Sequence, residues 1–229
     1  MTKALDLGAR IGEALDAVLD GDGAVLLAEA YFDPAGPFAA RSFHADGVND
    51  PLVIGRDDLL AVTLLDVRFP PLALRQLLDE PSEASEWLAD DVLPAGLCLW
   101  DAKPHHLNAL EGLRSWLMHG TDDEHKGVGY VIADKLAARK RPNLVPIIDR
   151  AVLRVIGPIG TRREFWTVLG EQLTSSRRKR LGQIGRQMRP AGDEVPAVRL
   201  LDALLWMHGS RSINARDARE VAGVQAHRP

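Results

Sequence analysis

Two glycines and one aspartate form the clearest chemical pattern in this chain of 229 residues. Gly127 and Gly129 are separated by one valine and followed by a helical run. Glycine permits a tight turn, and its bare backbone lets a phosphate approach the N–H groups that open the next helix. Asp149 comes 20 residues after Gly129. Because a helix and a short loop fill that interval, we expect the Asp149 carboxylate to return beside the glycines.

This pattern resembles the helix–hairpin–helix DNA glycosylase superfamily over about residues 107–157. The resemblance implies that the backbone of Gly127 and Gly129, with Tyr130 beside them, contacts duplex DNA. It assigns the catalytic role to Asp149, whose carboxylate would stabilise positive charge on the sugar and help to activate water. It also implies a monovalent cation held by backbone carbonyls of the hairpin, and no other cofactor.

The chain departs from that superfamily at several positions. Val131 stands where bifunctional members carry a nucleophilic lysine, so only monofunctional hydrolysis is expected. Asp149 has a second interpretation as a structural N-cap, because aspartate is a common residue at helix starts. The glycines likewise have a second interpretation as an ordinary helical turn. If the hairpin forms, we expect a positive φ at Gly129, so that valine would be less tolerated there than at Gly160.

The net charge of −4 conceals an uneven distribution along the chain. Residues 1–101 hold 19 acidic and 6 basic side chains, whereas residues 135–189 hold 14 basic and 3 acidic ones. A basic region attracts phosphates even when the whole molecule is acidic. The pattern predicts either a segment that faces DNA or two segments that pack together and neutralise each other.

Two runs of cations lie in the basic segment, and both are candidate contacts to DNA phosphates. The candidates are Arg139, Lys140 and Arg141 in the first run, and Arg177, Arg178, Lys179 and Arg180 in the second. Solvated helix ends are the alternative for both runs.

Apolar residues recur at spacings of three and four along most of the chain, which predicts helices. The strongest patterns cover residues 3–19, 57–66, 104–120, 165–173 and 198–207. Only residues 52–54 and 97–99 are weak candidates for strands. We therefore expect an all-α fold, a compact bundle of short helices with glycosylase-like architecture.

The domain organisation follows from the same patterns. Residues 1–207 are expected to form a single helical domain, in one lobe or two, and residues 208–229 a polar C-terminal tail. Segments such as Tyr31-Phe32-Asp33-Pro34 resemble a mostly actinobacterial family of uncharacterised proteins over about residues 28–207. That resemblance implies a complete family member and no particular activity.

Several classes of protein are disfavoured by composition. A single cysteine, Cys98, excludes an internal disulfide and an all-cysteine metal site. The histidines form no metal-binding motif, and no apolar run is long enough to span a membrane. We expect a cytoplasmic protein that binds duplex DNA, with or without base excision. A helical domain that binds a protein or a small molecule is the alternative.

Overall fold

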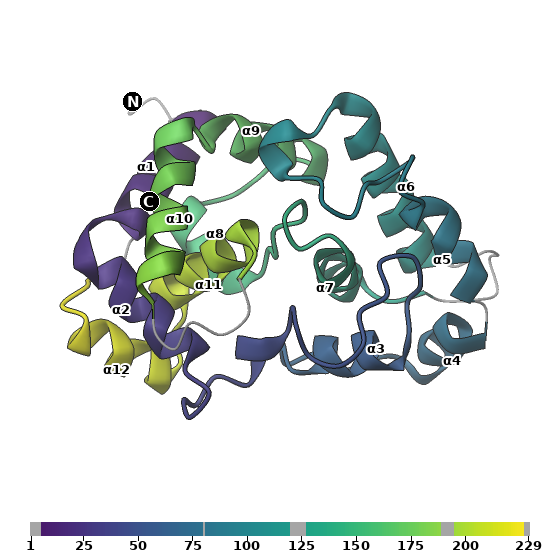
Figure 1. Ribbon diagram of the computed structural model, residues 1–229, viewed down its shortest axis with the longest axis horizontal. Helices are drawn as coiled ribbons and strands as arrows, with labels where there is room; N and C mark the ends of the chain where they lie inside the picture. The colour runs from purple at the N-terminus through teal and green to yellow at the C-terminus, as the bar shows by residue number, and fades with distance from the viewer. Residues whose placement is uncertain (1–5, 80, 120–126, 189–194, 227–229) are drawn as a thin grey trace. The chain divides into compact units, whose positions relative to one another are not determined.

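The computed structural model describes residues 6–79, 81–119, 127–188 and 195–226. Within these ranges the chain forms twelve α-helices and two short 3₁₀ helices, with no strand (Figure 1). The prediction of an all-α fold is confirmed. Neither residues 52–54 nor residues 97–99 form a strand.

The chain divides into two compact units. Unit 1 combines Met1–Arg41 with Ile148–Pro229, and unit 2 is the continuous segment Ser42–Ile147. Unit 1 therefore brings together the two ends of the sequence. Consequently, the predicted hairpin belongs to unit 2, whereas Asp149 belongs to unit 1.

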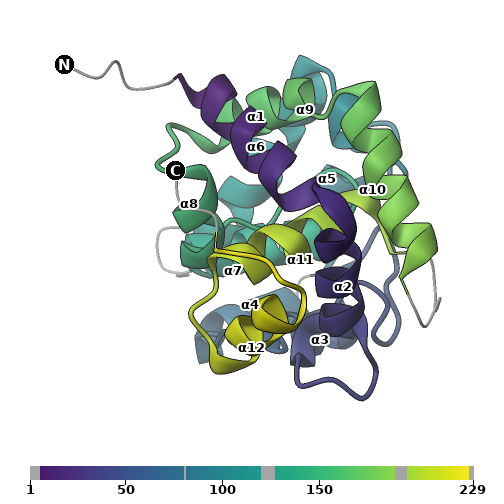
Figure 2. The ribbon, with the colours of Figure 1, turned by 90° about the vertical axis from the view of Figure 1, so that its left-hand side faces the viewer.

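Unit 1 is built around a single buried helix. Its α-helices are α1 (Leu7–Leu19), α2 (Gly21–Phe32), α8 (Arg150–Ile156), α9 (Arg162–Gln172), α10 (Ser175–Gln187), α11 (Ala197–Gly209) and α12 (Ile213–Val221). Helix α11 packs against α8, α2, α10, α12 and α1 (Figure 2). A helix that is apolar on most of its faces has to be covered on all sides, and the sequence of α11 has this character.

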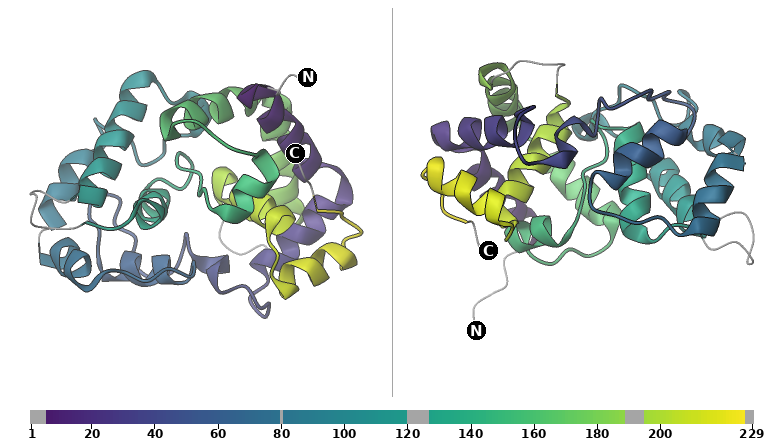
Figure 3. Two further views of the ribbon diagram at one scale, coloured as in Figure 1. Left: turned by 180° about the vertical axis from the view of Figure 1, so that it is seen from behind. Right: turned by 90° about the horizontal axis from the view of Figure 1, so that it is seen from below.

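Two helices of unit 1, α10 and α12, bury few apolar residues. The segment that forms α10 is rich in cations, and its buried side chains are few, chiefly Leu181 and Ile184. The predicted tail contains α12, which lies beside α2 (Figure 3). Buried Arg219 anchors α12 by donating hydrogen bonds to the carbonyl oxygens of Met207 and Ser210.

Unit 2 is organised around α7. Its α-helices are α3 (Arg56–Thr63), α4 (Pro71–Asp79), α5 (Pro81–Leu88), α6 (Pro104–His119) and α7 (Tyr130–Lys140). The 3₁₀ helix η2 (Leu99–Asp101) also belongs to it, and η1 (Ala39–Ser42) spans the boundary between the two units in the sequence. Helix α7 packs against α3 and α6, and its residues from Ile132 to Lys140 are buried. The cations at its C-terminal end, Arg139 and Lys140, are therefore surrounded by protein instead of solvent.

Candidate functional site

Helices α6 and α7 form a packed pair, and the segment that leads into α7 lies against α6. The N–H group of Val128 donates to the carbonyl oxygen of Leu117 at 2.8 Å. A Cβ atom on Gly127 would lie 2.3 Å from that same oxygen, so only glycine fits this approach. A buried ion pair between Arg114 and Asp134 joins the two helices further along.

Gly129 and Tyr130 lie on the surface at the start of α7. Gly129 is the N-cap residue, and a Cβ atom placed on it would meet nothing within 4 Å. Its φ of −64° contradicts the positive φ expected from the sequence. Tyr130 is 61% exposed. The first amides of a helix lack partners within the helix, so the surroundings of Gly129 leave room for a ligand to approach them. Residues 120–126, which complete the predicted turn, lie outside the described residues.

Asp149 is the N-cap of α8, as one of its two interpretations predicts. Its Oδ1 atom accepts hydrogen bonds from the backbone N–H groups of Ala151 and Val152, at 2.8 and 3.0 Å. Within the described part of the chain, no hydrogen bond to Oδ2 is formed. The carboxylate is half-buried. Its catalytic role and its return beside the hairpin both stay predictions.

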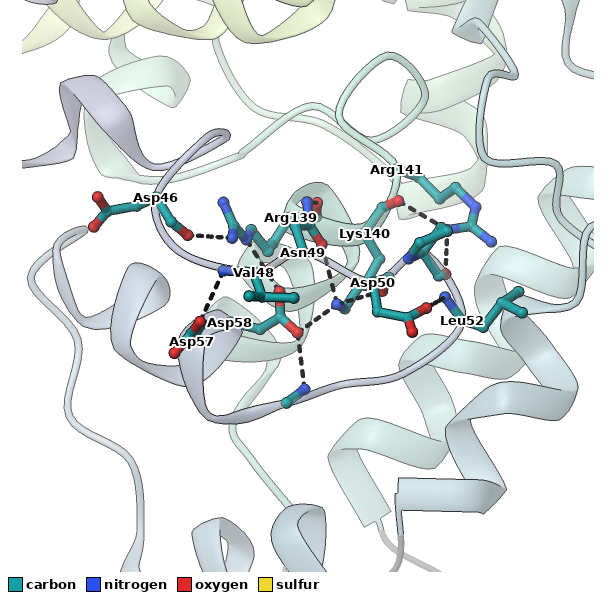
Figure 4. Close-up of polar contacts among 12 residues, drawn as sticks. Asp46, Val48, Asn49, Asp50, Leu52, Asp57, Asp58, Arg139, Lys140 and Arg141 are labelled. Carbon is teal, nitrogen blue, oxygen red and sulfur yellow. Dashed lines mark hydrogen bonds and ion pairs between the residues drawn. The ribbon is translucent and has the colours of Figure 1, made fainter.

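Arg139 and Lys140 are buried inside unit 2 and share the carboxylate of Asp58 (Figure 4). The Arg139 Nε atom lies 3.1 Å from Asp58 Oδ1, and the Lys140 ammonium group pairs with Oδ2. The two terminal nitrogens of Arg139 donate to the carbonyl oxygens of Phe43 and Asp46. Neither charged group is available to a DNA phosphate.

Lys140 has further partners in the loop that precedes α3. Its Nζ atom donates to the side chain of Asn49 at 3.0 Å and to the carbonyl oxygen of Asp50 at 2.9 Å. Burial lowers the pKa of Lys140, and its hydrogen bond to Asp58 partly opposes that effect. The lysine therefore links the C-terminal end of α7 to this loop.

Arg141 is also fully buried, but it is satisfied by backbone carbonyls instead of a carboxylate. Its guanidinium donates to the carbonyl oxygens of Leu88, Leu93 and Pro51 at 2.6–2.9 Å. Burial lowers its pKa to about 10. The expectation that residues 139–141 contact DNA phosphates is therefore wrong, because tertiary packing uses all three cations internally.

The second basic run is divided between two environments. Arg177 forms an ion pair with Asp16, with its Nε and Nη2 atoms at 2.8 and 2.9 Å from the two carboxylate oxygens. Arg180 donates to the carbonyl oxygens of Leu19 and Gly21. Both arginines thus tie α10 to the end of α1 and the start of α2. Arg178 is half-buried and Lys179 is exposed.

The ion pairs support the alternative in which acidic and basic segments neutralise each other. Asp16 and Asp58 come from the acidic segment, and their partners come from the basic one. The two units nevertheless differ in charge. Unit 1 contains 18 Lys and Arg against 15 Asp and Glu, whereas unit 2 contains 10 against 17. The positive balance belongs to unit 1, although the hairpin belongs to unit 2.

Two cavities have none of the predicted site residues in their walls. In unit 1, an open cavity of about 860 Å³ is lined by Asp20, His208 and residues 223–226, among others. In unit 2, a cavity of about 350 Å³ lies beside the loop that Lys140 holds, with Asp50 and Asp57 in its wall. The residues that line the cavity in unit 1 are far apart in the chain, whereas those that line the cavity in unit 2 all lie between residues 48 and 58.

No group of three or more His, Cys, Asp or Glu side chains suited to a metal ion exists among the described residues. His105 and His106 are in ring contact at 4.0 Å, and burial lowers the pKa of His106. The monovalent cation at the hairpin stays a prediction. In the described ranges, no helix has the length and apolar character needed to cross a membrane.

Comparison with known proteins places the chain in one family. No curated protein and no solved structure matches the sequence. Residues 24–209 match a protein family described as a family of unknown function, DUF6308. The match covers most of the chain and agrees with the expected span of about 28–207. The chain is therefore a member of the DUF6308 family.

Proposed function

We propose that this chain binds the backbone of duplex DNA through the hairpin between α6 and α7. The observation that carries the proposal is the contrast between the two glycines. Gly127 is packed against the backbone of Leu117, whereas Gly129 is exposed with open space around it. A helix start that presents its first amides to solvent suits a phosphate, because those amides and the helix dipole both favour an anion.

Tyr130 adds a second kind of contact to the proposed surface. Its ring is exposed directly beside Gly129. A side chain that wedges between the base steps of a duplex does not need a particular sequence. Together with backbone amides, such a contact supports binding without sequence preference.

The experiment that tests this proposal places a negative charge where the phosphate is expected. Gly129→Asp and Gly129→Asn both introduce good N-cap residues of nearly equal size, so both variants are expected to fold. Binding of a fluorescein-labelled duplex would be followed by anisotropy at low salt. Because a capping side chain occupies amides that are proposed to bind the phosphate, we expect both variants to bind more weakly than the wild type. The added charge should make the Asp variant bind roughly tenfold or more weakly than the Asn variant.

Equal affinities of the two variants would contradict the hairpin proposal. Undetectable binding by the wild type at low salt would remove the DNA proposal altogether. The helical interaction domain considered from the sequence would then be the better interpretation.

Base excision is a second candidate function, and the geometry of Asp149 favours it. One carboxylate oxygen satisfies both capping amides, so the helix start holds the group in a fixed orientation. In the proposed reaction water adds to the sugar carbon, the N-glycosidic bond breaks, and the base leaves with the proton. Asp149 stabilises the positive charge on the sugar. Because Val131 occupies the lysine position, no strand cleavage by a Schiff base follows.

A further inference from the structure

Helix α10 carries the most concentrated positive charge of the described structure. It contains five basic residues and no acidic one among its 13 residues. It also belongs to unit 1, the unit in which cations outnumber anions. Since the cations of α7 are buried in unit 2, α10 is the element best placed to attract a polyanion.

The cations of α10 fall on two faces. Arg177 and Arg180 point towards α1 and α2, where a carboxylate and backbone carbonyls satisfy them. Three cations remain on the other side of the helix, namely Arg178, Lys179 and Arg186. Lys179 and Arg186 are exposed, and Arg178 is half-buried with a hydrogen bond to the Ser175 hydroxyl.

Glycine at position 182 leaves space on this outer face for the Arg186 side chain. Residues 178, 182 and 186 are four apart, so they lie in one row along the helix. A Cβ atom on Gly182 would be 3.4 Å from Arg186 Nη1, so the Arg186 guanidinium lies across the position that a side chain would occupy. The row from Arg178 to Arg186 is about 12 Å long, at about 1.5 Å per residue. One DNA strand presents a phosphate about every 3.4 Å along the helix axis, so the row can face about three phosphates.

We propose that Arg178, Lys179 and Arg186 form a second DNA-backbone contact, on the outer face of α10. The proposal rests on the proposed function, because it assigns part of the same DNA-binding activity to a different unit. The contact is sequence-independent, since the three side chains meet phosphates and not bases. Arg177 and Arg180 have a structural role and do not contribute to it.

The salt dependence of binding tests this assignment. Each cation that neutralises a phosphate releases counterions, so the slope of log K against log salt reports how many contacts exist. The variant Arg178→Gln, Lys179→Gln, Arg186→Gln removes the outer face without changing the contacts of Arg177 and Arg180. We expect its slope to be smaller than that of the wild type by about two to three, with weaker binding to every duplex sequence.

A matched control removes three other exposed cations, through Arg68→Gln, Arg211→Gln and Arg216→Gln. This control has the same net charge as the outer-face variant and should keep nearly the wild-type slope. An unchanged slope in the outer-face variant, or an equal decrease in the control, overturns the proposal. Loss of binding to vesicles containing anionic lipid, with an unchanged DNA slope, would also overturn it and identify a membrane contact instead.

The two proposals fail in distinguishable ways. If Gly129→Asp has no effect while the outer-face variant loses its slope, the hairpin proposal fails and the α10 contact stands. If Gly129→Asp weakens binding while the outer-face variant keeps the wild-type slope, the hairpin stands as the DNA contact and the α10 proposal fails. A wild type that does not bind duplex DNA at low salt overturns both.

Discussion

The guanidinium of Arg139 and the carboxylate of Asp58 form an ion pair that solvent does not reach, with 0% and 1% of their side chains exposed. The same carboxylate accepts a hydrogen bond from the Gly55 N–H group at 2.8 Å and pairs with Lys140. A single anion therefore balances two buried cations. This cluster holds the loop before α3 against the end of α7, so its primary role is to stabilise unit 2.

Asp58→Asn should destabilise the protein strongly. The amide keeps the shape of the carboxylate but leaves two buried cations without an anion, and breaking such a pair typically costs about 3–5 kcal/mol. Urea unfolding followed by circular dichroism would measure the loss. Asp79→Asn is the control, because the exposed pair of Asp79 with Arg75 is worth about 0–1 kcal/mol. Similar losses of unfolding free energy in both variants would show that the Asp58 carboxylate is not what stabilises the two buried cations.

The same substitution at the two glycines of the hairpin should have different effects on stability. Gly127→Ser places a Cβ atom against the Leu117 carbonyl and should lower the free energy of unfolding by roughly 1–3 kcal/mol. Gly129→Ser meets no neighbour and adds a favourable N-cap, so stability should be unchanged or slightly higher. Thermal melts of both variants would test this. Equal stability of the two would contradict the close approach of Gly127 to α6.

Changes at Asp149 should separate helix capping from catalysis. Asp149→Asn should be nearly neutral for stability, whereas Asp149→Ala removes both capping bonds and should cost about 0.5–2 kcal/mol. If the chain excises bases, both variants should lose that activity, because neither carries the negative charge. The assay would use duplexes with alkylated, deaminated or oxidised bases, followed by alkali to cleave abasic sites.

Thr161→Ala is the matched control for that experiment. Thr161 caps α9 through its hydroxyl, so its loss should cost a similar amount of stability without affecting base release. Base release by Asp149→Asn at the wild-type rate would rule out the catalytic role. Strand cleavage without alkali would contradict the absence of a lysine at Val131.

The Asp16–Arg177 pair should make stability depend on acid pH. The hydrogen bond from Arg177 lowers the pKa of Asp16 below its usual value. A carboxyl group whose pKa is lower in the folded state stabilises the fold above its unfolded pKa, about 3.9. That contribution disappears as the pH falls through the lower, folded pKa. Asp16→Asn should therefore be less stable than the wild type at neutral pH, by a small amount because the carboxylate is mostly exposed.

The difference in the free energy of unfolding between Asp16→Asn and the wild type should shrink below about pH 4. Urea unfolding at a series of pH values from neutral to acidic would measure it. A difference that is constant over the whole range would show that the ion pair does not link α1 to α10.

Local patterns in the sequence were sufficient for several features of this protein. Apolar spacing predicted an all-α fold, and the glycines at 127 and 129 marked the start of α7. The N-cap interpretation of Asp149 predicted a helix start, and Asp149 caps α8. These features depend on backbone geometry and on residues within one or two helical turns, so the local sequence contains the information that determines them.

The roles of the cations were decided by tertiary structure alone. As sequences, residues 139–141 and 177–180 are equivalent basic runs, yet the first is wholly buried and the second is only partly used. The partners of Arg139 and Arg141 include carbonyl oxygens of Phe43 and Leu93, which precede them by 96 and 48 residues. A buried cation is stable only where such distant acceptors converge on it, and no local pattern reports that convergence. Helix α10 is a second case that the local sequence could not decide. Its few apolar residues gave no helical signal. Its packing against α1, α2 and α11 determines which of its cations face solvent.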